Sequence, residues 1–166
     1  MTWKDRYRPD IIYDNLDSID LQILKNKGIK GIVLDIDNTI SEPGEKKASP
    51  GVEQWIRMAA NEGFEICVLS NSSQRRVDGF TQNMNIAAIG SANKPSRRSF
   101  RKAACKLSLR PDQVAVIGDQ LFTDISGGNR AGMYTVLVTP INTNNEWFFI
   151  RFKRVLERII KNSWDK

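Results

Sequence analysis

A chain of 166 residues that is 40% hydrophobic and 27% charged has the size and composition of one globular domain, which excludes a disordered or fibrous protein. It contains no histidine, and this absence excludes Ser-His-Asp triads, Cys-His nucleophile pairs and zinc sites built from histidine. The net charge of +6 leaves three kinds of acidic partner open: nucleic acid, an anionic membrane surface or a phosphorylated substrate.

The N-terminus and the two cysteines both indicate a cytoplasmic protein. The first ten residues carry charges where a signal peptide has an apolar core, and no run approaches the roughly 18 apolar residues of a membrane span. Cys67 and Cys105 lie far apart within apolar stretches. We therefore expect both to be buried, reduced thiols.

Short apolar runs alternate with helical stretches along most of the chain. A short helix that ends at Gly28 is expected first, capped by Asp17 or Ser18. The runs typical of strands are residues 31–37, 64–70, 86–89, 114–119 and 134–138. The helices between them have boundary residues at Ser49-Pro50, Gly63, Ser72 or Ser73, Ser96 and Gly132.

This alternation predicts an α/β fold with a doubly wound, Rossmann-like, five-stranded parallel sheet, because near-continuous apolar strands are covered on both faces. We expect a single domain over residues 1–166. Its core covers about residues 28–140, and an amphipathic, basic helix follows at about 145–164.

Polar residues follow four of the predicted strands, and parallel strands all end at one edge of a sheet. These residues are Asp35, Asp37, Asn38 and Thr39; Ser70, Asn71 and Ser72; Lys94; and Asp119 with Asp124. Four carboxylates at one edge repel one another unless a cation lies among them, and oxygen ligands without histidine favour Mg²⁺. A lysine and a serine at the same edge suit a phosphoryl group. Taken singly, these residues are equally typical of helix caps, turns or solvated loops.

In order and placement, the strand-end segments resemble the four motifs of phosphatases of the haloacid dehalogenase (HAD) superfamily. The segments are residues 35–39, Ser70, Lys94-Pro95 and residues 118–124. The longer segments 34–39 and 118–132 are similar to the YqeG-type branch of subfamily IIIA. The similarity extends from about Pro9 to Pro140, and four weak motifs in order are together specific.

The resemblance implies a role for each matching residue. Asp35 would be the nucleophile that becomes an aspartyl phosphate, and Asp37 the general acid and base. Ser70 would donate a hydrogen bond to the phosphoryl group, whose charge Lys94 would neutralise. The implied metal ligands are Asp35, the backbone carbonyl of Asp37, Asp119 and Asp124. The residues expected beside the substrate are Asn38, Thr39, Asn71 and Lys94, with Thr39 also supporting its loop.

No cap domain fits this chain, because only about 26 residues separate Asp37 from Phe64 and most of them are needed for a helix. An open site favours a large substrate or one held at a surface. Two basic segments offer such a surface, residues 94–110 and the terminal helix at 145–164. The apolar stripe of that helix suits either an anionic membrane or packing against the sheet or a second subunit.

Some YqeG-like relatives hydrolyse phosphatidylglycerophosphate (PGP), so the resemblance implies a Mg²⁺-dependent PGP phosphatase, peripheral on the inner face of the membrane. The alternative enzyme is a HAD phosphatase for a nucleic-acid end, a phosphoprotein or a soluble phosphate ester. Nucleic acid is not the first choice, because Phe100 is the only aromatic residue in segment 94–110. The alternative outside enzymology is a phosphate-binding switch or scaffold.

Overall fold

A computed structural model of the chain describes residues 5–143 together with Glu157 and Ile160. The helix predicted at about 145–164 lies outside these residues, apart from Glu157 and Ile160, which are both helical. In the part of the chain that is described, no helix has the length and hydropathy needed to cross a bilayer.

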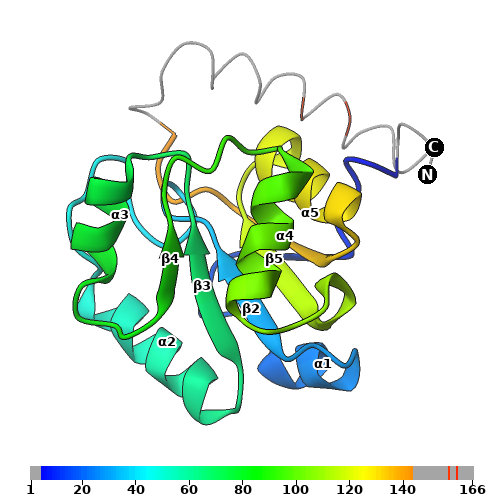
Figure 1. Cartoon of the computed structure of the whole chain (residues 1–166), viewed down its shortest axis with the longest axis horizontal. Coiled ribbons are helices and arrows are strands. Elements are labelled where there is room, and N and C mark those ends of the chain that lie inside the picture. Colours follow the sequence, from blue (N-terminus) through cyan, green and yellow to red (C-terminus); the bar gives the residue numbers. More distant parts are fainter. Residues whose placement is uncertain (1–4, 144–156, 158–159, 161–166) are drawn as a thin grey trace.

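The centre of the fold is a parallel sheet with the strand order β1-β6-β5-β2-β3-β4 (Figure 1). Its strands are β1 (Ile11–Tyr13), β2 (Gly31–Leu34), β3 (Glu65–Leu69), β4 (Ala87–Ile89), β5 (Val114–Gly118) and β6 (Tyr134–Val138). The α/β parallel fold is confirmed, but the sheet has six strands and not five. The strand that sequence reasoning missed is β1, which has three residues and pairs only with β6 at the edge. Such a short, half-exposed strand carries no periodicity of its own.

The helices are α1 (Leu21–Asn26), α2 (Pro50–Asn61), α3 (Gln74–Thr81), α4 (Arg97–Lys106) and α5 (Ser126–Ala131). Ser49 and Ser73 cap α2 and α3, because their hydroxyls accept hydrogen bonds from backbone N–H groups of the first turn. Gly132 ends α5 in the left-handed conformation, with φ of 82°.

The expected cap of α1 was wrong. Asp20 caps this helix and accepts a hydrogen bond from the backbone N–H of Gln22. Ser18 instead forms a local turn with Asn15, whose side-chain oxygen accepts from the Ser18 backbone N–H. Ser18 and Asp20 are both of residue types that favour an N-cap position. Residue type alone therefore does not decide which of them begins the helix.

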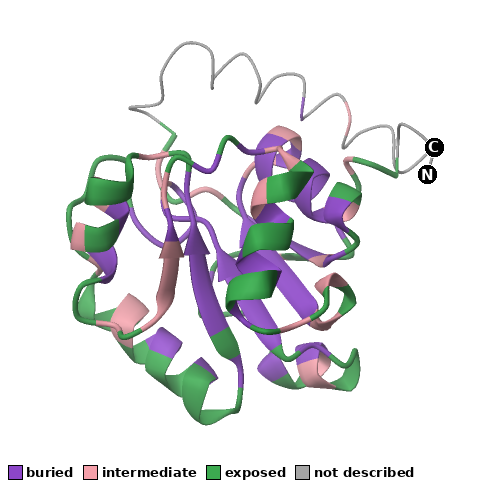
Figure 2. Cartoon of the chain, in the orientation of Figure 1, coloured by how far each residue is buried: buried purple, intermediate pink, exposed green. Residues whose placement is uncertain are grey.

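Helices cover both faces of the sheet, as a doubly wound fold requires. Ile32 and Leu34 of β2 pack in the core with α1, α2 and α3, whereas Val33 packs in a second core with α4 and α5. Figure 2 shows the central strands buried between these layers. Cys67 is buried in the second core, but Cys105 is exposed on α4, which corrects the expectation that both thiols are buried.

Candidate active site

The site lies at the carboxyl edge of the sheet, where the chain leaves β2, β3 and β5. Asp35, Ser70 and Asp119 are the first residues after these strands, and all three are buried. The backbone N–H of Asp35 donates to the carbonyl of Ile117 at 3.0 Å, so the strand pairing holds the start of this loop. The fold thereby brings together residues that are more than 80 positions apart in sequence.

Three carboxylates and one lysine form the centre of the site. Asp35, Asp119 and Asp124 each offer an oxygen within 4.8 Å of the others, and all three are buried. The Nζ of Lys94 donates to Asp35 Oδ1 at 2.5 Å and to Asp124 Oδ1 at 2.6 Å. One lysine against three carboxylates leaves an excess of negative charge that a divalent cation would cancel. This donor set of buried oxygens therefore fits a divalent metal.

Burial changes the proton affinities of the charged groups at this centre. Burial raises the pKa of Asp35 to about 8, against the opposing effect of Lys94, and the carboxylates of Asp124 and Asp119 add to the rise. Burial alone would lower the pKa of Lys94, but the charges of Asp124 and Asp35 outweigh it and raise that pKa above its ordinary value. Lys94 therefore stays charged, whereas an ionised Asp35 benefits from further positive charge.

Asp124 is positioned by a π-helical turn over Leu121–Ile125, which begins three residues after the end of β5. Its Oδ2 accepts hydrogen bonds from the backbone N–H of Gln120 at 3.2 Å and from Thr123 Oγ1 at 3.3 Å. A Cβ at Gly118 would lie 2.4 Å from Asp124 Cβ and Cγ, so the glycine is needed for this approach. Sequence reasoning did not foresee the π-helical turn.

Thr39 lies between two of the carboxylates. Its hydroxyl is 3.1 Å from Asp119 Oδ1 and 3.4 Å from Asp35 Oδ2, and its single proton is shared between these acceptors. Thr39 is buried. It thus orients the carboxylates from within the motif loop.

The Asp37 carboxylate is not part of this cluster of three and is bound instead by an arginine. Arg76 of α3 donates from Nη2 to Asp37 Oδ1 at 2.7 Å and from Nη1 to Asp37 Oδ2 at 2.8 Å. Ser72 Oγ also donates to Oδ2, at 3.2 Å. Sequence reasoning missed Arg76, since nothing in the sequence distinguishes it from its neighbour Arg75. The described contacts of the Asp37 carboxylate are with these residues and the backbone N–H of Gly44.

The remaining predicted site residues make contacts within the protein. Asn38 has a positive φ of 65°, and its Oδ1 accepts from the backbone N–H of Asn142 at 3.0 Å. Asn71 Oδ1 accepts from the backbone N–H of Lys94 at 2.7 Å, which fixes the segment that carries the lysine. The Ser70 hydroxyl accepts from the backbone N–H of Ser72 at 3.1 Å. The structure thus assigns Asn38 and Asn71 contacts that hold the loops around the cluster.

Several curated proteins are similar to this chain over nearly its whole length. "Probable phosphatase YqeG" of Bacillus subtilis is 36% identical over 157 residues, covering 95% of this chain and 91% of the relative. "Phosphatidylglycerophosphate phosphatase 1, chloroplastic/mitochondrial" of Arabidopsis thaliana is 30% identical over 165 residues. That alignment covers 94% of this chain and 47% of the plant protein, so the chain spans about half of the plant protein's length.

Solved structures agree on the fold. The cobalt-bound form of the deoxy-D-mannose-octulosonate 8-phosphate phosphatase of Haemophilus influenzae superposes with a TM-score of 0.56 at 13% identity. The superposition covers 86% of this chain and 92% of that protein. At this identity the likeness is one of fold alone.

A family match covers most of the chain. Residues 1–142 match the family described as mitochondrial PGP phosphatase. Together with the YqeG relative, this match supports a phosphatase and not a scaffold that merely shares the architecture. The chain therefore belongs to the PGP phosphatase family and is a YqeG-like phosphatase.

Proposed function

We propose that this protein hydrolyses the phosphomonoester of PGP with Mg²⁺ and an aspartyl-phosphate intermediate on Asp35. The single observation that carries the proposal is the buried group of Asp35, Asp119 and Asp124 around Lys94, with Asp37 two residues from Asp35. The family match and the plant relative named for PGP support the choice of substrate.

In the first step, a carboxylate oxygen of Asp35 attacks phosphorus, and the bond from phosphorus to the ester oxygen breaks. Asp37 gives a proton to the departing oxygen, which leaves as an alcohol. Lys94 balances charge on the phosphoryl oxygens, and the Ser70 hydroxyl donates a hydrogen bond to them. Asp35 then carries the phosphoryl group as a mixed anhydride.

In the second step, a water molecule attacks phosphorus, and Asp37 takes a proton from it. The bond from phosphorus to Asp35 breaks, inorganic phosphate leaves, and both carboxyl groups return to their starting states. Asp35, Asp119, Asp124 and the backbone carbonyl of Asp37 would hold Mg²⁺, which supplies positive charge to the phosphoryl oxygens when bound.

Asp37 needs freedom of movement for this role. Both of its oxygens accept hydrogen bonds from Arg76 in this structure. To transfer a proton, one oxygen has to exchange a guanidinium contact for the ester oxygen. We propose Arg76 as the residue that positions Asp37 between the two steps.

An open site suits a lipid substrate. The described segment between β2 and β3 contains α2 and a loop, with no inserted cap domain. Exposed cations follow Lys94 along α4: Arg97, Arg98, Arg101, Lys102 and Lys106. We propose that they attract the protein to an anionic bilayer, as a cytoplasmic protein peripheral on the inner face of the membrane. We also propose that residues 1–166 form a single domain.

The test is phosphate release by the purified full chain from PGP in mixed micelles, with Mg²⁺ and with EDTA. We expect turnover that needs Mg²⁺ and disappears in EDTA. Hydrolysis of a soluble phosphate ester without hydrolysis of PGP would reject the lipid substrate and favour a soluble-ester phosphatase. Activity that persists after chelation would reject the metal site.

A further inference from the structure

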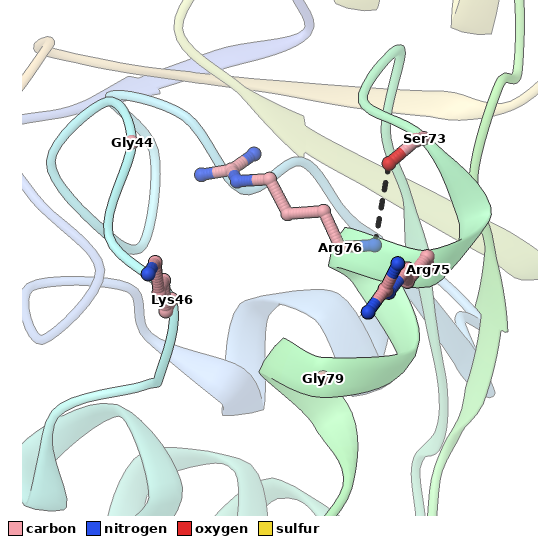
Figure 3. A pocket seen from close by; sticks show the side chains of 6 residues that line it. All are labelled: Gly44, Lys46, Ser73, Arg75, Arg76 and Gly79. Atoms are coloured by element: carbon pink, nitrogen blue, oxygen red, sulfur yellow. Dashed lines mark hydrogen bonds between the residues drawn. The ribbon is translucent and has the colours of Figure 1, made fainter.

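A concave site opens next to Asp37, since Gly44 and Arg76, which line it, both donate hydrogen bonds to the Asp37 carboxylate. It has a volume of about 460 Å³ and lies between the loop after β2 and the first turns of α3 (Figure 3). Its lining consists of Gly44, Lys46, Ser73, Arg75, Arg76 and Gly79. We call it the basic pocket.

The basic pocket is positively charged. Lys46, Arg75 and Arg76 line it, and no carboxylate side chain does. Arg76 is paired with Asp37, but in the described part of the chain neither Lys46 nor Arg75 has a side-chain ion pair or hydrogen bond. Two exposed cations at one concavity thus remain available to an anion.

Arg76 connects the basic pocket with the reaction. Its guanidinium reaches Asp37 with both Nη atoms, and Nη2 also donates to the carbonyl of Glu45 at 3.1 Å. Figure 3 shows its side chain extending toward the loop that carries Gly44. In an in-line transfer the leaving oxygen lies opposite the nucleophile and beside the general acid. A leaving alcohol that departs beside Asp37 would therefore lie near residues that line this pocket.

We propose that the basic pocket binds a second phosphate on the leaving alcohol of the substrate. In PGP this group is the phosphodiester, one glycerol unit away from the phosphomonoester that is cleaved. The inference rests on the proposed function and adds a determinant of substrate specificity to it. Lys46 and Arg75 would favour substrates with two phosphates over esters with one. Two glycines leave space for the group, since a Cβ at Gly44 or Gly79 would meet no atom within 4 Å.

The test compares two soluble substrates, so that attraction to a membrane plays no part. One is the deacylated head group of PGP, which has both phosphates, and the other is glycerol 1-phosphate, which has one. For the double variant Lys46→Ala/Arg75→Ala, we expect kcat/KM on the head group to fall about ten- to hundredfold. The free energy of hydrogen bonds to a charged group corresponds to a factor of that size. On glycerol 1-phosphate we expect no change.

Lys27→Ala/Lys30→Ala is the matched control, because it removes the same charge from exposed positions outside the pocket. A second pair tests the pocket without removing any side chain. Gly79→Glu places a carboxylate where Gly79→Gln places a neutral group of the same size. We expect the glutamate variant to lose activity on the head group and the glutamine variant to retain much more.

Wild-type protein that uses both substrates equally well, or a double variant that loses activity equally on both, would overturn the inference and leave the phosphatase function standing. An equal loss of kcat/KM on the head group in Lys27→Ala/Lys30→Ala would also overturn it, because the effect would then come from net charge and not from the pocket. Hydrolysis of the head group with the expected dependence on Lys46 and Arg75, but no hydrolysis of PGP in micelles, would support the pocket and reject only the lipid. Failure to release phosphate from any ester would reject both proposals.

Discussion

Replacing Gly118 with alanine tests whether the position of Asp124 limits the chemistry. The added Cβ would lie 2.4 Å from Asp124 Cβ and Cγ, whereas ordinary van der Waals contact begins at 3.4 Å. The Asp124 side chain therefore has to withdraw by about 1 Å, and a displacement of that size costs about a hundredfold in rate. The 2.6 Å bond between Lys94 and Asp124 would be lost or lengthened in the same movement.

Gly118→Ala should also unfold more easily, because overpacking of a buried site costs about 1–3 kcal/mol. Gly128→Ala is the control for this effect. Its Cβ would lie 2.7 Å from Thr135 Cγ2, in a buried region without predicted catalytic residues.

The assays are the free energy of unfolding in urea and kcat with saturating Mg²⁺. We expect both variants to lose stability, but only Gly118→Ala to lose about a hundredfold in kcat. A Gly118→Ala protein with the wild-type kcat would refute the argument that the close approach of Asp124 to the strand is required. An equal loss of kcat in Gly128→Ala would trace the effect to general destabilisation.

Four further predictions concern Lys94, Asp35, Asp37 and Glu157. Lys94→Met leaves the buried carboxylates of Asp35 and Asp124 without their cation. It should lower the free energy of unfolding of the metal-free protein, measured in urea, by about 3–5 kcal/mol. Unchanged stability would contradict these ion pairs. Because the pKa of Asp35 rises from 3.8 to about 8 on folding, the folded state binds more protons between these values, so stability in EDTA should fall as pH rises through this window. The same measurement on Asp35→Asn, subtracted from the wild-type free energy of unfolding at each pH, isolates the contribution of Asp35. A difference that stays constant or rises with pH would contradict the raised pKa. Asp37→Asn should fold normally and lose about 10²- to 10⁴-fold in turnover, with unchanged hydrolysis excluding it as the general acid and base. Glu157→Ala removes the acceptor of a 2.8 Å hydrogen bond from the buried backbone N–H of Leu121 and should cost about 1–3 kcal/mol, measurable as a lower Tm.

The architecture was largely predictable from local patterns. The five runs of apolar residues read as strands are all strands, because a strand buried on both faces has to be apolar along its length. The grouping of Asp35, Lys94, Asp119 and Asp124 also follows from the sequence, since parallel strands end at one edge whatever fills the loops between them. The edge strand β1 escaped prediction, because three half-exposed residues leave no such pattern.

Other features depend on how distant segments meet. Arg76 and Arg75 are adjacent residues of the same type, yet only Arg76 reaches Asp37, because the helix directs the two side chains differently. Cys105 is exposed although its neighbour Ala104 is buried, for the same reason. The π-helical turn at Asp124 requires the contact with Gly118 across the strand end, and the basic pocket requires the β2 loop to lie against α3. The sequence by itself determined where five of the six strands lie along the chain and which residues follow them, since burial and chain direction act locally. The tertiary structure alone decided which charges pair across the site, because that depends on the rotation of each helix against the sheet.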